Sequence, residues 1–130
     1  MSRIVIIGYP MAGKSTLAKT LGLPVFCTDP KSTVRQPDPG VTYMPEGIEW
    51  SKQSDYVIDQ WFKKESFVIE GVGAVRALRK LASYYTLMPC DKIIFMQNKQ
   101  PLDKHIAMVK SVQSIWGEIA LMYRHITEYR

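Results

Sequence analysis

The chain has 130 residues, of which 46% are hydrophobic and 22% are charged. This length favours a single domain over 1–130, with one core and one main site. The apolar runs are far shorter than the roughly 18 residues of a membrane span, so we expect a soluble protein without a membrane partner. Seventeen Lys and Arg against twelve Asp and Glu give a net charge of +5, which favours acidic ligands such as nucleotides or nucleic acid.

The start of the chain and its cysteines favour a cytoplasmic protein. Met1-Ser2-Arg3 leads into an apolar run of only four residues, which is too short for the apolar region of a signal peptide. Cys27 and Cys90 lie far apart, and neither belongs to a CxxC motif or has a nearby His partner. We therefore expect neither a disulfide framework nor a zinc site.

The first part of the chain predicts two strands on either side of a glycine-rich turn and a helix. Residues 3–8 form a β-branched run that ends in glycine, and residues 15–21 have helical character. A second short strand over 25–28 brings Asp29 to its carboxyl end. We expect these segments to build a strand–turn–helix–strand unit.

The segment 30–49 is rich in residues that interrupt regular structure. It contains four prolines and two glycines, namely Pro30, Pro37, Pro39, Pro45, Gly40 and Gly47. This composition predicts a long loop rather than a helix or strand. Long loops inside a compact domain are usually functional or disordered, so we expect this one to cover a substrate.

The remainder of the chain alternates helical and extended patterns. We predict a helix over 51–65, a strand over 67–70, a helix after Gly71, a strand over 92–96 and a helical segment over 103–130. About four short strands that alternate with helices predict an α/β fold with a parallel sheet and helices on both of its faces. Such a fold binds its ligand at the carboxyl ends of the strands.

The strongest functional signal is the segment from Gly8 to Ser15, which matches the Walker A pattern G-x-x-x-x-G-K-S. It follows an expected buried strand and precedes an expected helix, as a phosphate-binding loop requires. Gly8 and Gly13 allow the backbone amides to turn toward phosphates, Lys14 reaches the β- and γ-phosphates, and Ser15 offers a hydroxyl to magnesium. The alternative is a glycine turn with a chance lysine. We expect a nucleoside triphosphate and Mg²⁺ as ligands.

Acidic residues follow the second and third predicted strands. Asp29 is the candidate catalytic base or water-held magnesium ligand, because a carboxylate there could face an acceptor hydroxyl. The alternative is a turn aspartate before Pro30. Glu70 ends the third strand and is a possible magnesium ligand beside Ser15. Arg35 could clamp phosphate or transition-state charge, or it could be a solvated loop residue.

Further candidate ligand contacts are basic or aromatic. Arg76 and Arg79 could pair with acidic groups of the substrate, or they could form an exposed basic helix face. Tyr9, Tyr43 and Trp50 stand where a base could stack.

These residues resemble the nucleoside- and nucleotide-kinase group of P-loop proteins over roughly residues 3–97. The resemblance implies a three-layer P-loop NTPase fold with the strand order 2-3-1-4-5. It also implies a kinase that binds ATP. The implied ATP-binding residues are Gly8, Tyr9, Pro10, Met11, Ala12, Gly13, Lys14, Ser15 and Thr16. Asp29 with Arg35 resembles the base-and-arginine pair of polynucleotide-kinase-type enzymes, and Glu70-Gly71 matches an acidic-glycine step after the third strand.

A narrower resemblance joins two segments to bacteriophage 5-hydroxymethyldeoxyuridine DNA kinases. The segments are 68–79, which reads Val-Ile-Glu-Gly-Val-Gly-Ala-Val-Arg-Ala-Leu-Arg, and the later stretch 108–116. This resemblance implies transfer of the ATP γ-phosphate to the hydroxymethyl group of 5-hydroxymethyluracil in phage DNA, during thymidine hypermodification. It also implies DNA with a modified base as a partner, and a location in the host cytoplasm if the chain is phage-encoded. Reaching a base in duplex DNA would require flipping it out of the helix.

The chain departs from the kinase pattern after the fourth strand. A fifth strand with an adenine-contacting loop is not evident. The segment 98–104 stands in place of an arginine-rich lid, with Lys99, Lys104 or Arg124 as weak substitutes.

Other functions stay open. A kinase for a free nucleoside, a nucleotide or a small metabolite is the main alternative. A nucleotide-binding protein without transfer activity is another. The segment 98–100 imitates the guanine-reading Asn-Lys-x-Asp of GTPases, but Pro101 occupies the aspartate position and no Asp-x-x-Gly follows the third strand.

Overall fold

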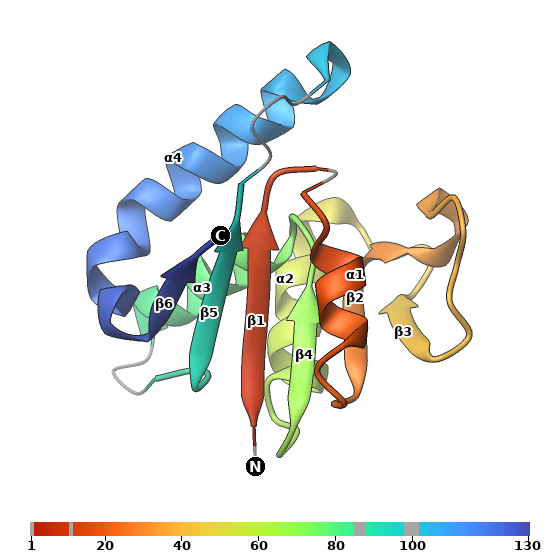
Figure 1. Ribbon diagram of the computed structural model, residues 1–130, viewed down its shortest axis with the longest axis horizontal. Coiled ribbons are helices and arrows are strands. Elements are labelled where there is room, and N and C mark those ends of the chain that lie inside the picture. The colour runs from red at the N-terminus through yellow and green to blue at the C-terminus, as the bar shows by residue number, and fades with distance from the viewer. Residues whose placement is uncertain (1, 11, 85–87, 98–101) are drawn as a thin grey trace.

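The computed structural model describes residues 2–10, 12–84, 88–97 and 102–130. It contains one sheet of parallel strands (Figure 1). The strands are β1 (Arg3–Gly8), β2 (Val25–Pro30), β3 (Val41–Met44), β4 (Phe67–Glu70), β5 (Lys92–Met96) and β6 (Thr127–Tyr129). None of the helices in the described part of the chain combines the length and the apolar character that a membrane crossing requires.

Helical segments connect most of the strands. The α-helices are α1 (Lys14–Lys19), α2 (Gln53–Tyr56), α3 (Ala74–Tyr84) and α4 (Ile106–Tyr123). Short 3₁₀ segments occur at Lys31–Thr33, Trp50–Lys52, Asp103–His105 and Arg124–Ile126, and Val57–Trp61 is π-helical. The predicted helix over 51–65 is therefore a mixed helical run that ends at Trp61.

The strands lie in the order β3-β2-β4-β1-β5-β6, with every neighbouring pair parallel. β1 is central, since Val5 is paired with Ile69 of β4 on one side and with Ile93 of β5 on the other. The α/β class and the parallel sheet are confirmed. The expected number of about four strands is wrong, because the described residues form a sheet of six.

The two additional strands lie at the edges of the sheet. β3 pairs with β2 inside the segment 30–49, which we predicted to be a loop throughout. β6 pairs with β5, whereas the sequence pattern predicted helix to residue 130 and no fifth strand after 92–96. Both strands are short, with four and three residues. Their regular structure depends on backbone hydrogen bonds to a neighbouring strand that local sequence does not reveal.

The two faces of the sheet are covered unequally. Side chains alternate along each strand, so that Val5 and Ile7 of β1 face α2, α3 and α4, whereas Ile6 faces α1. We call these the three-helix face and the α1 face. In Figure 1, α1 lies in front of the sheet and α2 and α3 lie behind it. The three-helix face holds the larger core, with fully buried Trp61 and Phe67.

Candidate functional site

The site is built around the end of β1, where Gly8 cannot be replaced without strain. Its φ is +148°, and a Cβ atom there would lie 2.0 Å from the carbonyl oxygen of Met96 in β5. The amide of Tyr9 donates to that same carbonyl at 3.2 Å. The chain thus leaves β1 tied to its neighbouring strand, and a glycine is required because the two backbones approach so closely.

The turn after β1 leads directly into α1. The amide of Ala12 donates to the Tyr9 carbonyl at 3.3 Å, and Gly13 has a left-handed φ of +91°. The amide of Leu17 donates to the Gly13 carbonyl at 3.0 Å and begins the helical pattern. In Figure 1 this turn lies at the top of the sheet, at the end to which the arrowhead of β1 points. The predicted contact of Met11 lies outside the described residues.

Lys14 is a buried cation at the first position of α1. Its side chain is 8% exposed, and Nζ donates to the Tyr9 carbonyl at 2.5 Å. Burial lowers the pKa of Lys14, while the negative charges of Glu70 and Asp29 oppose that shift. The ammonium therefore has one hydrogen bond within its own loop. A phosphate oxygen could replace the carbonyl as the hydrogen-bond partner. Its negative charge would stabilise the charged form of Lys14, which burial disfavours.

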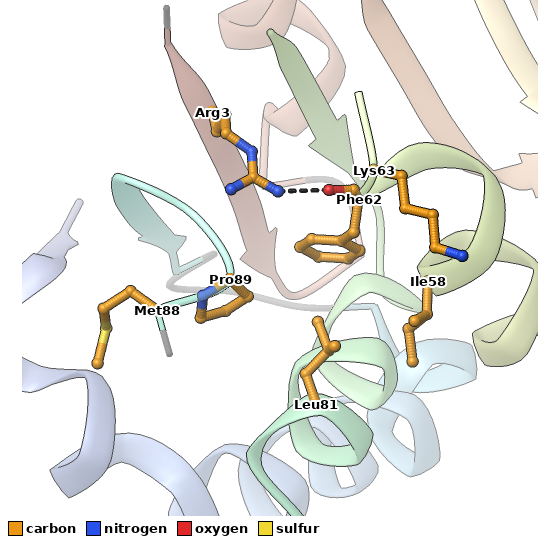
Figure 2. Close-up of a pocket in the computed structure, with 7 residues that line it drawn as sticks. All are labelled: Arg3, Ile58, Phe62, Lys63, Leu81, Met88 and Pro89. Carbon is orange, nitrogen blue, oxygen red and sulfur yellow. Dashed lines mark hydrogen bonds between the residues drawn. The ribbon is translucent and has the colours of Figure 1, made fainter. Parts of the chain in front are cut away.

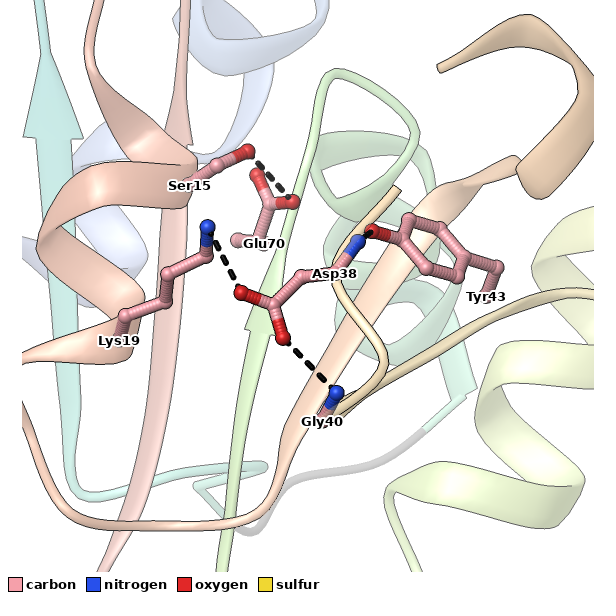
Figure 3. Close-up of polar contacts among 6 residues, drawn as sticks. All are labelled: Ser15, Lys19, Asp38, Gly40, Tyr43 and Glu70. Atoms are coloured by element: carbon pink, nitrogen blue, oxygen red, sulfur yellow. Dashed lines mark hydrogen bonds and ion pairs between the residues drawn. The ribbon is translucent and has the colours of Figure 1, made fainter. Parts of the chain in front are cut away.

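Ser15 and Glu70 form a pair of oxygen groups next to Lys14. Ser15 Oγ donates to Glu70 Oε1 at 3.1 Å, and Glu70 is only 3% exposed (Figure 3). Burial raises the pKa of Glu70, although hydrogen bonds from Cys27 and Ser15 and the charge of Lys14 act in the opposite direction. The charged form of this carboxyl group is therefore only partly compensated in its buried position.

The Ser15–Glu70 pair fits a magnesium ion that is shared with phosphates. Mg²⁺ prefers oxygen ligands, keeps several waters, and is usually held by one or two carboxylates together with substrate phosphates. Residues 2–10, 12–84, 88–97 and 102–130 contain no group of three His, Cys, Asp or Glu side chains that could form an all-protein metal site. The Ser15–Glu70 pair therefore suits a magnesium ion that is shared with substrate phosphates, rather than a metal ion held by protein side chains alone.

Asp29 lines the same cavity as the Ser15–Glu70 pair. Alternation along β2 directs Val25, Cys27 and Asp29 to one face, and all three line a cavity of about 160 Å³ on the α1 face, together with Ser15 and Glu70. Asp29 is exposed at the rim of the cavity, but surrounding residues partly desolvate its carboxylate and thereby raise its pKa. The positive charge of Lys14 acts in the opposite direction and lowers this pKa. A partly desolvated carboxylate at this position could accept a proton.

Sequence reasoning missed Cys27 as a member of this cavity. Burial raises the pKa of its thiol, and the negative charge of Glu70 together with a hydrogen bond to it acts in the same direction. The thiol is therefore a neutral hydrogen-bond donor to Glu70. Its position two residues before Asp29 in a strand was a signal that could have placed it on the same face.

Lys19, Asp38 and Tyr43 form a polar latch (Figure 3), and two of them, Lys19 and Tyr43, line the cavity. Lys19 Nζ lies 2.9 Å from Asp38 Oδ2, and the Asp38 amide donates to the Tyr43 hydroxyl at 2.7 Å. Asp38 Oδ1 also accepts from the Gly40 amide at 2.8 Å. The hydrogen bond with Lys19 is the main reason that the pKa of Asp38 is lowered. The latch ties the segment 31–40 to the end of α1, and the sequence pattern did not predict it.

The remaining predicted residues are spread more widely. Arg35 is exposed and is absent from the described lining of the cavity, which holds its neighbours Val34 and Gln36. Arg76 lies over the ring of Trp50, with its guanidinium carbon 3.7 Å from the ring centroid. Arg79 Nη1 lies 3.6 Å from Glu118 Oε2 of α4. The structure thus brings Lys14, Ser15, Asp29 and Glu70 together, but it does not bring these three arginines to them.

The other predicted nucleotide contacts lie around the turn. Pro10 is half-buried and Thr16 is exposed. Tyr9 packs edge-on against Phe95, with ring centroids 5.5 Å apart, and its hydroxyl accepts from Gln113 Nε2 at 3.1 Å. Residues 98–101, which include the predicted lid residue Lys99 and the GTPase-like Asn98 and Gln100, lie outside the described residues.

A second hollow of about 220 Å³ lies at the opposite end of the strands, where β1 begins (Figure 2). Arg3 donates from its guanidinium to the Phe62 carbonyl there, and the neighbouring side chains of Ile58 and Leu81 are apolar. No carboxylate occurs among the described residues that line this hollow. It lacks the acid–base groups of the cavity beside Lys14, so that cavity is the better candidate for chemistry.

Comparisons with known proteins found no match from which the roles of the site residues could be transferred. No protein-family model matches the chain, and no curated protein gives a significant match to its sequence.

Proposed function

We propose that the chain is an ATP-dependent phosphotransferase with a P-loop NTPase fold, which transfers the γ-phosphate of ATP to a hydroxyl group. The observation that carries the proposal is that the Ser15–Glu70 pair and Asp29 line one cavity, while the charge of the buried Lys14 interacts with both Glu70 and Asp29. A buried cation suits a triphosphate, an oxygen pair suits magnesium, and a carboxylate beside them suits a hydroxyl acceptor.

The arrangement of the strands supports the P-loop fold. The four strands expected from the sequence occur as β2-β4-β1-β5, which is the order 2-3-1-4 when they are counted along the chain. β6 adds a fifth strand beside β5, which completes the order 2-3-1-4-5 implied by the resemblance, and β3 extends the opposite edge. Helices pack on both faces of the sheet, as a three-layer arrangement requires.

In the proposed binding mode, residues Gly8 to Thr16 hold the phosphates of ATP. Gly8 and Gly13 have positive φ, so the loop can present backbone amides without side-chain obstruction. Lys14 leaves the Tyr9 carbonyl and binds the β- and γ-phosphates. Ser15 and Glu70 would hold a magnesium ion, which would neutralise negative charge on the phosphates.

Asp29 orients the acceptor and takes its proton. The acceptor oxygen forms a bond to the γ-phosphorus as the bond from that phosphorus to the β-bridging oxygen breaks, so ADP leaves with the electron pair. The acceptor's proton passes to a carboxylate oxygen of Asp29. Lys14 stabilises the charge on the transferred group, because its ammonium lies in a site with little water. Arg35 and Arg76 would assist only after moving toward the cavity.

We propose the 5-hydroxymethyl group of 5-hydroxymethyluracil in DNA as the acceptor. The resemblance of 68–79 and 108–116 to DNA kinases of bacteriophages supports this choice, as does the net charge of +5. Modified DNA would then be the partner, and the host cytoplasm would be the location of a phage-encoded enzyme.

The second candidate acceptor is a free nucleoside, nucleotide or small metabolite. It is favoured by the cavity of about 160 Å³, which is smaller than usual for a whole drug-sized ligand.

The test is to incubate the protein and magnesium with γ-labelled ATP and, separately, DNA containing hydroxymethyluracil, ordinary DNA of the same sequence, and a panel of nucleosides. We expect label on the modified DNA alone. Asp29→Asn should abolish most of that transfer while ATP binding persists, and the matched Asp59→Asn change, on an exposed helical residue, should not. Label on a nucleoside instead would replace the acceptor, and undiminished transfer by Asp29→Asn would refute the assigned base.

A further inference from the structure

A third hollow, of about 430 Å³, lies between the start of α2 and the outer side of α3. Its lining combines two exposed aromatic residues with three cationic ones, and its described members include Trp50, Arg76, Arg79, Lys80, Tyr84 and Glu118. Trp50 is 65% exposed and Tyr84 is 72% exposed. Exposed aromatic rings beside cations are the features by which proteins bind single-stranded nucleic acid.

Trp50 and Arg76 form a preassembled stack. The guanidinium carbon of Arg76 is 3.7 Å from the centre of the Trp50 ring and covers one face of it. The high exposure of Trp50 leaves most of the remaining indole surface open to solvent. A nucleobase that stacks on the open face would meet a ring whose position Arg76 already restricts, which lowers the entropy lost on binding.

The charges of the hollow favour an anionic occupant. Among its described lining residues, Arg76, Arg79 and Lys80 are cationic and Glu118 is the acidic one. Partial burial and the nearby charge of Arg79 lower the pKa of Arg76, so the two cations repel each other. Arg79 has a long contact with Glu118, and Lys80 pairs with Asp55. Both pairs are substantially exposed to solvent, so phosphates could replace the carboxylates at little cost.

The hollow adjoins a smaller cleft, which shares Trp50 and Arg76 with it and reaches Thr28 near the end of β2. Gly73 also lines this cleft, next to Thr28. Thr28 Oγ1 accepts from the Gly73 amide at 3.2 Å on one face of the sheet, while the next residue, Asp29, lines the cavity on the other face. A nucleic-acid strand with its acceptor at Asp29 would therefore pass over Gly73 onto Trp50.

We propose that the hollow at Trp50, Arg79 and Lys80 docks the single-stranded segment of nucleic acid that flanks the acceptor nucleotide. One base stacks on the open face of Trp50, and backbone phosphates contact Arg79 and Lys80. This inference rests on the proposed function for the position of the acceptor, but the docking itself requires no phosphate transfer. Binding can therefore be measured without ATP or magnesium, so that its failure is separate from a failure of catalysis.

The experiment titrates the protein with an unlabelled single-stranded DNA oligonucleotide and follows tryptophan fluorescence, with anisotropy of a labelled oligonucleotide measured in parallel. Trp61 and Trp116 are buried, so quenching by DNA should report Trp50. We expect Trp50→Ala to weaken binding about tenfold, in line with the loss of one stacked base. Trp50→Phe should lose the quenching while it retains binding within about threefold, because the ring is kept.

Arg79→Gln tests the phosphate contact against a matched change beside a different hollow. Arg79→Gln should weaken binding and reduce its dependence on salt, whereas Lys63→Gln, beside the hollow of Figure 2, should do neither. A duplex of the same sequence should bind more weakly and quench less. Unchanged binding by Trp50→Ala, equal quenching by duplex, or equal quenching by a polyglutamate peptide would each overturn the proposal.

Discussion

The α1 face and the three-helix face of the sheet receive alternate side chains from the same strands, yet they differ in composition. Phe26 and Ile69 lie in the large core under α2, α3 and α4, whereas the neighbouring Cys27 and Glu70 line the cavity on the α1 face. α1 has only six residues and covers a small apolar cluster around Ile6. The short helix leaves room for a cavity beside it, and the site occupies that room.

The two faces also differ in the electrostatic environment of their side chains. On the α1 face, burial lowers the pKa of Lys14 and raises the pKa values of Asp29 and Glu70, so each charged form is disfavoured by its surroundings. The described core on the three-helix face consists of apolar and aromatic side chains, among them Trp61 and Phe95. We infer that this face supplies the free energy of folding that a strained, desolvated site requires.

The largest expected effect is kinetic and falls on the α1 face. Lys14→Met removes the buried ammonium, and we expect labelled-phosphate transfer to fall by about 10²–10³-fold, as for the loss of one preorganised charge-stabilising group. Lys19→Met, one helical turn or more away, breaks an exposed contact with Asp38 and should cost less than about tenfold. Similar losses for the two variants would contradict the distinction between site and latch.

The largest expected effect on stability falls on the three-helix face. Trp61 is 2% exposed, and Trp61→Ala should lower the free energy of unfolding by about 3–5 kcal/mol through lost burial and a new cavity. Leu121→Ala removes an apolar side chain that is 81% exposed and should change it by less than about 0.5 kcal/mol. Urea denaturation measures both, and a small loss for Trp61→Ala would show that this face is not the main source of stability.

Two glycines with positive φ, Gly8 and Gly22, test the close approach of β1 and β5 through smaller effects on stability. Gly22→Ala should cost about 1–2 kcal/mol, because its φ is +70° and no atom lies within 4 Å of the added Cβ. Gly8→Ala should cost more, since its Cβ would also collide with the Met96 carbonyl. Thermal unfolding of the two variants compares backbone strain alone with strain plus a clash, and equal shifts in Tm would argue against the close contact of β1 and β5 at this point.

The smallest expected effect is a pH dependence from Glu70. Burial raises its pKa in the folded protein above the ordinary value of 4.5, so the folded state binds the proton more readily than the unfolded state. Its contribution to stability is therefore complete below pH 4.5 and is lost as pH rises through the raised pKa. Glu70→Gln should remove this slope while it retains an oxygen that can accept from Ser15. Identical pH profiles of the unfolding free energy in wild type and variant would contradict the raised pKa.

Much of the central sheet could be predicted because its strands have strong local signals. The apolar runs of β1, β4 and β5 are continuous, as expected for parallel strands buried on both faces. β3 and β6 could not be predicted, because four residues between proline- and glycine-rich turns and three residues after a long helix carry little local preference. Each becomes a strand only because β2 or β5 presents an unpaired edge to it.

The sequence by itself determined the phosphate-loop pattern from Gly8 to Ser15, and it placed Asp29 and Glu70 at the carboxyl ends of strands. These features depend on local torsions and on the parallel alternation of strands and helices. Tertiary structure alone decided that Cys27 joins Glu70, that Asp38 latches onto Lys19, and that Arg35 stays outside the cavity. Such contacts depend on how elements distant in sequence pack together, and on which side chains that packing exposes or removes from water.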